Sequence, residues 1–243
     1  MKILINHVLL LPLLLFGQSA IDNATATHLE KIIDMRHQIH QNPELGNREF
    51  KTAELVADHL RSLDFDEVKT AVAHTGVIGI LKGGKPGGVV AVRADMDGLP
   101  VTEDTDLPFK STARTTYLDK EVGVMHACGH DIHTSVQLGV ASVLASIRYE
   151  IPGTVKFIFQ PAEEGPPPGE EGGADLMLKE GAFDDPKPIA VFGLHTHPGL
   201  EVGQIGITIG PAMAAVDHFI IKIRGKQSHG AYPHESVDPI IMA

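Results

Sequence analysis

The sequence predicts an α/β fold, in which helices flank a mostly parallel β-sheet. Short apolar runs bounded by Gly or Pro alternate along the chain with segments whose apolar residues recur at helical spacing. Strands that alternate with helices are typical of sheets in which neighbouring strands run parallel. Asp, Glu and His residues follow directly after several of the apolar runs. Because ligands of such sheets bind beyond the carboxyl ends of the strands, we expect the functional site there.

The individual elements follow from the same patterns. Apolar residues at helical spacing predict a first helix that ends near His40, before Pro43, and further helices at 50–63, 131–147 and 174–180. Short apolar runs predict strands at 77–81, 89–92, 154–159 and 189–194. A tight turn is expected in the glycine-rich segment 83–88, between the first two strands. From about Met213 the pattern changes, and an amphipathic strand is expected at 218–224 and a helix from Val237.

Residues 1–20 are expected to form a secretory signal peptide. Lys2 gives a positive start, an apolar stretch runs from Val8 to Phe16, and small residues at 17–20 supply a cleavage site. The apolar stretch is too short to span a bilayer core of about 30 Å. Pro12 disfavours a buried core helix. We therefore expect an exported protein, periplasmic or secreted, that makes no membrane contact after signal cleavage.

Composition restricts the class of partner. The formal net charge of -11 argues against nucleic acid or an anionic membrane surface. The chain has no Trp, so a base-stacking platform is not expected either. A hydrophobic fraction of 43% is enough to build a sizeable core. These properties favour a globular protein that acts on a small molecule.

The segment His126–Asp131 carries the strongest chemical signal. It contains Cys128, the only cysteine of the sequence, two positions before His130. A lone thiol beside imidazoles and carboxylates is either a metal ligand or a nucleophile. Further donors are supplied downstream by Glu163, Glu164, His195 and His197. Thiolate, imidazole and carboxylate together suit Zn, Mn, Co or Ni better than Ca or Mg.

Six ordered segments of the chain resemble the M20 family of metallopeptidases and amidohydrolases. They are Arg36–Leu45, Arg93–Pro100, His126–Asp131, Gln160–Glu164, Gly193–Pro198 and Gly225–Ile240. The resemblance is to the cysteine-containing subgroup of aminoacylases, hippurate hydrolases and auxin-conjugate hydrolases. It implies a zinc-exopeptidase-like catalytic domain at 21–212 and the start of an inserted α+β lid or dimerisation domain at 213–243. The chain is then expected to be truncated within that lid.

The resemblance also implies the roles of single residues around two divalent metal ions. The implied metal ligands are Cys128, His130, Glu164 and His195, with Glu164 bridging the two ions. Glu163 is implied as the general base and Asp97 as a residue that orients the ligands. His229 is implied to reach a neighbouring active site in a homodimer formed through the lid, where it holds the oxyanion or the substrate carboxylate. His197 is interpreted as a loop or supporting histidine, and Asp95 receives no role.

We therefore expect a metal-dependent amidohydrolase that cleaves N-acyl-amino acids with a metal-activated water. The products would be a carboxylate and an amino acid. Three alternatives stay open: a dipeptidase or carboxypeptidase of the same fold, an inactive truncated fragment, and a cysteine hydrolase with Cys128 as nucleophile. The cysteine hydrolase leaves Glu163, Glu164 and His195 without a role.

Overall fold

A five-stranded mixed β-sheet lies at the centre of the first of two units in the chain. The computed structural model describes residues 5–214 and 219–243, with side chains from residue 20, and the first unit ends at His197. The helices of this unit are α1 (Ile5–Gln41), α2 (Phe50–Ser62), α3 (His130–Ser146), η1 (Arg148–Glu150) and α4 (Gly173–Lys179). Its strands are β1 (Glu67–Val72), β2 (Gly76–Lys82), β3 (Lys85–Asp95), β4 (Arg114–Tyr117), β5 (Lys120–Gly123), β6 (Pro152–Gln160) and β7 (Ala190–Gly193).

The strand order of the sheet is β1-β2-β6-β3-β7. β3 pairs in parallel with both β6 and β7, whereas β2 runs antiparallel to β1 and to β6. Four of the five strands therefore point in the same direction, and only β2 is reversed. The predicted α/β class with a mostly parallel sheet is confirmed. β4 and β5 form a separate two-stranded hairpin.

The two strands expected to be joined by a tight turn, β2 and β3, are not hydrogen-bonded to each other. β6 lies between them, and the turn at Gly83 and Gly84 crosses the start of β6. Gly83 donates from its backbone N–H to Gly153 O at 2.8 Å. A Cβ at Gly83 would lie 2.2 Å from Ile151 O, so only glycine lets the two backbones pass this closely.

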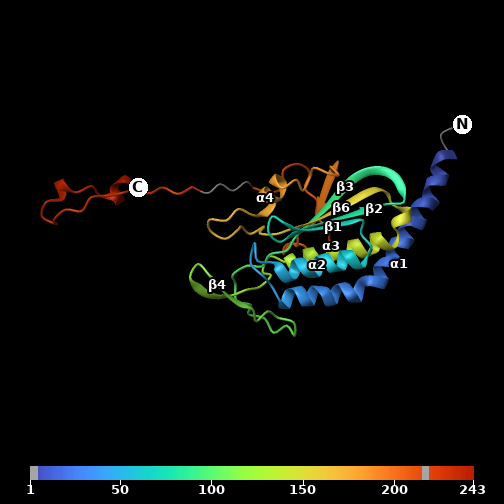
Figure 1. Cartoon of the computed structure of the whole chain (residues 1–243), viewed down its shortest axis with the longest axis horizontal. Helices are drawn as coiled ribbons and strands as arrows, with labels where there is room; N and C mark the ends of the chain where they lie inside the picture. Colours follow the sequence, from blue (N-terminus) through green and yellow to red (C-terminus); the bar gives the residue numbers. More distant parts are fainter. Residues whose placement is uncertain (1–4, 215–218) are drawn as a thin grey trace. The chain divides into compact units, whose positions relative to one another are not determined.

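Each face of the sheet packs against its own helices. Figure 1 shows α2 and α3 beneath the strands, with α1 packed along α3 and α4 on the other side. Alternate residues of β6 serve the two faces, as expected for a strand buried on both sides. Phe157 and Phe159 point into the core shared with α2 and α3, whereas Ile158 packs with Met177 of α4. The sheet is thus packed on both faces, and this packing holds the ends of its parallel strands in place.

The second unit, from Pro198 to the end of the chain, holds η2 (Pro233–Glu235) and α5 (Pro239–Met242). Asp238 caps α5 by accepting a hydrogen bond from Ile240 N at 2.9 Å. The strand expected at 218–224 is wrong for the described residues 219–224, which form no strand, and His218 lies outside the described residues. A strand needs a hydrogen-bonding neighbour, and the ladder contact described in this unit is the single bridge Lys226–Val237. The domain boundary predicted at residue 213 stays a prediction.

The described helices contain no segment long and apolar enough to cross a membrane.

Candidate metal centre

The candidate site lies at the edge of the sheet where β3, β6 and β7 end. Asp95 is the last residue of β3, and Asp97 follows it. The other donors follow β6 and β7 or stand at the start of α3: Glu163, Glu164, His195, Cys128 and His130. Because β3, β6 and β7 are parallel neighbours, their carboxyl ends meet at one edge. The topology therefore collects donors that are far apart in the sequence.

Three sets of possible metal-ligating atoms share His130, and two of them contain the implied ligands. Its ring forms one set with Cys128 and His195 and another with Glu163 and Glu164, and the atoms of each set lie within 4.8 Å of one another. The four residues implied as metal ligands and the implied base are thus brought to one place. Both glutamates lie equally near His130: Glu163 Oε2 and Glu164 Oε1 are each 3.8 Å from its Nε2.

The orientation of the His130 ring is set by Asp97. His130 Nδ1 lies 3.2 Å from Asp97 Oδ1, which makes Nδ1 the protonated nitrogen. The other Asp97 oxygen, Oδ2, accepts a hydrogen bond from Glu164 N at 2.9 Å. One buried carboxylate therefore holds two of the implied ligands. This is how an aspartate orients ligands without binding metal itself.

His130 Nε2 is buried and has no hydrogen-bond partner. Leaving such an atom unsatisfied costs about 1–3 kcal/mol. The atom faces carboxylate oxygens of Glu163, Glu164 and Asp95, all at 3.8 Å. A divalent ion would satisfy the nitrogen and neutralise the carboxylates, and the mixture of S, N and O donors suits a transition metal. The residues present therefore fit a metal centre.

Charge accumulates around His130 and shifts the protonation of its neighbours. Burial opposes the protonated form of His130, but the hydrogen bond to Asp97 and the charge of Asp95 outweigh it and raise its pKa. Burial, reinforced by Asp95, raises the pKa of Glu163. Burial also disfavours the Asp95 carboxylate, yet the hydrogen bond from His133 and the neighbouring cations hold its pKa well below the usual range. The site thus carries a surplus of acidic groups.

Cys128 lies beside a histidine but is not activated by it. Its Sγ is 3.5 Å from His195 Nε2. Burial, followed by the nearby Glu164 and Glu163, raises the pKa of the Cys128 thiol to about 12. Nucleophilic cysteines have a lowered pKa, because the thiolate is the reactive form. The surroundings of Cys128 are those of a ligand that ionises when a cation arrives.

Two sequence-predicted residues lie outside these donor sets. His197 is exposed and belongs to neither set. His229 lies in the second unit, where its Nδ1 accepts a hydrogen bond from Ala231 N at 3.2 Å and its ring is 5.6 Å from that of Tyr232. Its implied role at a neighbouring active site stays a prediction.

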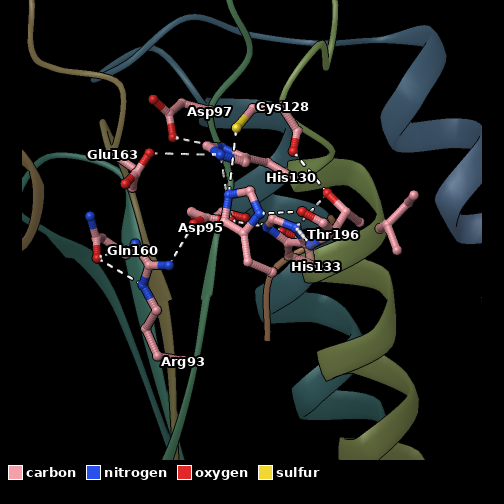
Figure 2. A network of polar contacts seen from close by, with 12 residues as sticks. Arg93, Asp95, Asp97, Cys128, His130, His133, Gln160, Glu163 and Thr196 are labelled. Atoms are coloured by element: carbon pink, nitrogen blue, oxygen red, sulfur yellow. Dashed lines mark hydrogen bonds and ion pairs between the residues drawn. The ribbon is translucent and has the colours of Figure 1, made fainter. Parts of the chain in front are cut away.

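Sequence reasoning missed residues that hold the site in place. Figure 2 shows Asp95 between Arg93 and His133, with Thr196 beside His133. His133 stands three residues after His130, on the same face of α3, and this spacing was the available signal. Asp95 and Thr196 gave no such signal, because their partners come from other elements.

Glu49 is a further buried residue that the sequence did not identify. Its side chain is fully buried and accepts hydrogen bonds from Ala162 N, at 2.7 Å, and from Thr75 Oγ1. Ala162 has a positive φ of 46° and directly precedes Glu163. Glu49 therefore fixes the unusual turn that presents the two glutamates.

A cavity of about 730 Å³ adjoins the site. Asp97 and Glu164 line it, together with the β4–β5 hairpin at Arg114–Leu118 and the loop at Pro167. This volume lies within the range of about 300–1,000 Å³ common for small-molecule sites. Phe50 and Leu118, which are both well exposed, add apolar surface to its lining.

The sequence matches one protein family, described as Peptidase family M20/M25/M40, over residues 91–242. A protein of Bacillus subtilis (strain 168) named N-acetylcysteine deacetylase is 42% identical over 213 residues, which are 88% of this chain and 52% of that protein. A protein of Saccharolobus solfataricus named thermostable carboxypeptidase 2 is 42% identical over 212 residues, which are 87% of this chain and 51% of that protein. The chain thus spans about half the length of these curated relatives.

A solved structure shows the same architecture. It is a Bacillus subtilis protein described as a dinuclear metal-binding peptidase of the M20 family. The TM-score is 0.65 at 40% sequence identity, and the match covers 75% of this chain and 47% of that one.

Proposed function

The chain belongs to the peptidase family M20/M25/M40, and we propose that it carries the metal centre of an amidohydrolase that cleaves N-acyl-amino acids. One observation carries the proposal: the unpartnered, buried Nε2 of His130 lies where the thiol–imidazole and carboxylate donor sets meet. The relative named N-acetylcysteine deacetylase supports this substrate class, because N-acetylcysteine is an N-acyl-amino acid.

Two divalent ions are proposed, consistent with the solved relative described as dinuclear. Cys128, His130, Glu164 and His195 would together hold the two ions, and His130, with Nε2 as its one available ring nitrogen, would serve one ion only. The ions can be Zn, Mn, Co or Ni on the chemistry of the donors. When bound, such ions polarise the scissile carbonyl and lower the pKa of a bound water.

The protein's own groups complete the reaction. Glu163 is the proposed general base, because it is the more exposed of the two glutamates, 37% against 27% for the side chains. Its raised pKa helps it to retain the proton and pass it to the leaving amine. The adjoining cavity can receive the acyl group or the amino-acid side chain of the substrate.

The second candidate is a carboxypeptidase or dipeptidase of the same fold. The relative named thermostable carboxypeptidase 2, at equal identity, favours it. Both candidates use the same metal centre and differ only in the group on the acyl side of the cleaved amide. A cysteine hydrolase is disfavoured, because the pKa of the Cys128 thiol is raised rather than lowered.

The test compares substrates and metal dependence in the purified protein. We expect hydrolysis of N-acyl-amino acids to exceed that of dipeptides and of peptides cleaved at the C-terminus. A chelator should abolish it, and added Zn, Mn or Co should restore it. Activity that survives the chelator but not a thiol alkylator would contradict the proposal in favour of the cysteine hydrolase.

Variants of Glu163 and Glu164 should lose activity for different reasons. Glu163→Gln should keep its metal and lose about 10²–10⁴-fold in turnover, because the general base is gone. Glu164→Gln should lose metal as well as activity. Elemental analysis after dialysis measures the difference, and equal metal content in the two variants would contradict this division of roles.

Export and homodimerisation are further parts of the proposal. The apolar leader at residues 1–20 supports export to the periplasm or the medium. The resemblance of Gly225–Ile240, the segment that contains His229, to the M20 family is the ground for proposing a homodimer in which each subunit serves its neighbour's site. Cell fractionation tests the first, and the second predicts that a His229→Ala subunit and an inactive Glu163→Gln subunit recover activity when mixed.

A further inference from the structure

We propose that Thr196 and His133, anchored by Asp95, are positioning residues that hold the His195 ring against Cys128. The inference rests on the proposed metal centre and concerns how its more exposed half is built. His195 follows β7, an edge strand of four residues in which Val191 and Phe192 are 47% and 62% exposed. The sheet therefore provides little packing for the segment that carries this ligand, and other contacts must hold it.

His133 supplies the first of these contacts. Its Nδ1 donates to Asp95 Oδ1 at 2.6 Å, and its Nε2 accepts from the backbone N–H of Thr196 at 2.9 Å. These two bonds define the tautomer of the ring, with the proton on Nδ1. The His133 ring also packs against the His195 ring, with their centroids 4.5 Å apart. His133 is buried, so its hydrogen bond to Asp95 is protected from water, and the bond from Thr196 is partly so.

Thr196 connects this histidine to both ligands. Its hydroxyl donates to the backbone carbonyl of Cys128 at 3.1 Å. Its own carbonyl accepts from His195 Nδ1 at 2.6 Å, which leaves His195 Nε2 free beside the Cys128 sulfur. Gly129 makes the contact possible: its φ is +89°, and a Cβ there would lie 2.5 Å from Thr196 Oγ1. One residue thus fixes the distance between the Cys128 loop and the His195 loop.

Asp95 ties the assembly to the rigid part of the sheet. Its side chain accepts from Arg93, whose guanidinium also donates to Gln160 Oε1 at 2.8 and 3.0 Å. Its backbone carbonyl accepts from Thr134 Oγ1 at 2.7 Å. The contacts therefore run from β3 and β6 through α3 to the segment after β7. This gives Asp95 a role that its position in the sequence did not reveal.

A competing assignment makes His133 itself a ligand, because Asp95, His130 and His133 form a third group of potential ligand atoms. The hydrogen bonds argue against it. Both ring nitrogens of His133 are engaged, whereas His130 Nε2 is buried without a partner. A metal at His133 would have to displace one of its two existing hydrogen bonds, while at His130 it fills an unsatisfied position.

The experiment measures metal binding rather than turnover in the full chain. The variants are Thr196→Val, which removes only the hydroxyl, Thr196→Ser, which keeps it, and His133→Phe, which keeps a ring but loses both hydrogen bonds. His59→Gln is the matched control, since His59 is also a buried histidine but bonds to Ser142 Oγ, between α2 and α3. Zinc affinity is measured by competition with a chromophoric chelator. Cobalt-loaded protein gives a sulfur-to-cobalt charge-transfer band that reports the Cys128 bond.

We expect Thr196→Val and His133→Phe to weaken binding of the ion at Cys128 and His195 by about 10–100-fold, as is usual when a partner of a metal ligand is removed. The charge-transfer band should shift or weaken in both. Thr196→Ser and His59→Gln should match the wild type in both measurements. Thermal unfolding of the metal-free proteins shows whether a variant has lost its fold. If His133→Phe does not fold, Thr196→Val still tests the proposal.

Wild-type affinity and an unchanged band in Thr196→Val would overturn the proposal. A loss of one bound ion in His133→Phe with no effect in Thr196→Val would overturn it in favour of His133 as a ligand. A wild-type protein that binds no zinc or cobalt would remove the metal centre and this inference together. A protein that binds both ions but hydrolyses no acyl-amino acid would contradict the proposed function alone, with the positioning result unaffected.

Discussion

Replacing Asp97 by Asn should weaken metal binding without weakening the metal-free fold. Asp97 accepts one hydrogen bond from His130 Nδ1, at 3.2 Å, and one from Glu164 N, at 2.9 Å. An amide has only one oxygen, so in the Asp97→Asn variant the side-chain NH₂ group would face one of these two donors. The cost of one lost bond to a charged acceptor is about 1.5–3 kcal/mol. That corresponds to a loss of about 10–100-fold in metal affinity, since about 1.4 kcal/mol is tenfold.

The folding stability of the metal-free protein should not fall in the Asp97→Asn variant. Asp97 is buried, and its charge adds to burial, the main cause, in raising the pKa of Glu49. Removing that charge relieves repulsion, which offsets the lost hydrogen bond. We therefore expect the melting temperature of metal-free Asp97→Asn to stay at or above that of the wild type.

Chelator competition for zinc and thermal unfolding of the metal-free protein measure the two effects. Asp66→Asn is the control, because Asp66 also accepts from a backbone N–H, that of Lys82 at 2.8 Å, and from a cation, Arg148 at 2.6 Å, but is exposed and belongs to no candidate metal-ligand set. Wild-type zinc affinity in Asp97→Asn, or an equal loss of affinity in Asp66→Asn, would refute the reasoning.

Two further predictions follow from the pKa shifts. Because the pKa of the Cys128 thiol is raised to about 12, metal binding at neutral pH should release about one proton from this residue. Calorimetry in buffers of different ionisation enthalpy measures the number of protons released, and Cys128→Ser should reduce it. Burial raises the pKa of Glu49 from 4.5 to about 7, so between these values the folded state binds a proton that the unfolded state does not. The folding stability of the metal-free protein should therefore fall by up to about 3 kcal/mol as pH rises through this window. In urea unfolding, Glu49→Gln should make the stability less dependent on pH, and an unchanged pH dependence in this variant would contradict the role given to Glu49.

Much of the fold could be predicted from local pattern. The apolar run at 154–159 and the helical spacing at 131–147 correspond to β6 and α3 within two residues at each end. Both elements are buried against the sheet or within it, so their sequence pattern reflects their surroundings directly. The M20 family membership implied by the six segments is likewise confirmed.

Sequence patterns did not predict the elements and contacts that depend on residues far away in the chain. β1 and the β4–β5 hairpin are short and largely exposed, so no apolar run marks them. The alternation at 219–224 indicated a strand that has no neighbour to pair with among the described residues of its unit. In the site, Cys128 and Glu164 could be named from their motifs, but the supporting roles of Asp95, Thr196 and Glu49 arise from contacts across three or more elements. Such roles become visible only when the strand order is known.

The charge balance of the site explains why these supporting contacts are needed. Three carboxylates, from Asp95, Glu163 and Glu164, stand 3.8 Å from one histidine nitrogen. Burial, together with repulsion between such groups, raises the pKa of Glu163 and of the Cys128 thiol, and the repulsion opposes this arrangement of the side chains when no cation is bound. Side chains that repel one another would turn outward into water unless other bonds held them. Arg93 neutralises one of them from the sheet side, and the Glu49 contact fixes the turn that carries the other two. Binding of divalent cations would then relieve repulsion in a site already in place, so metal affinity and folding stability should rise together.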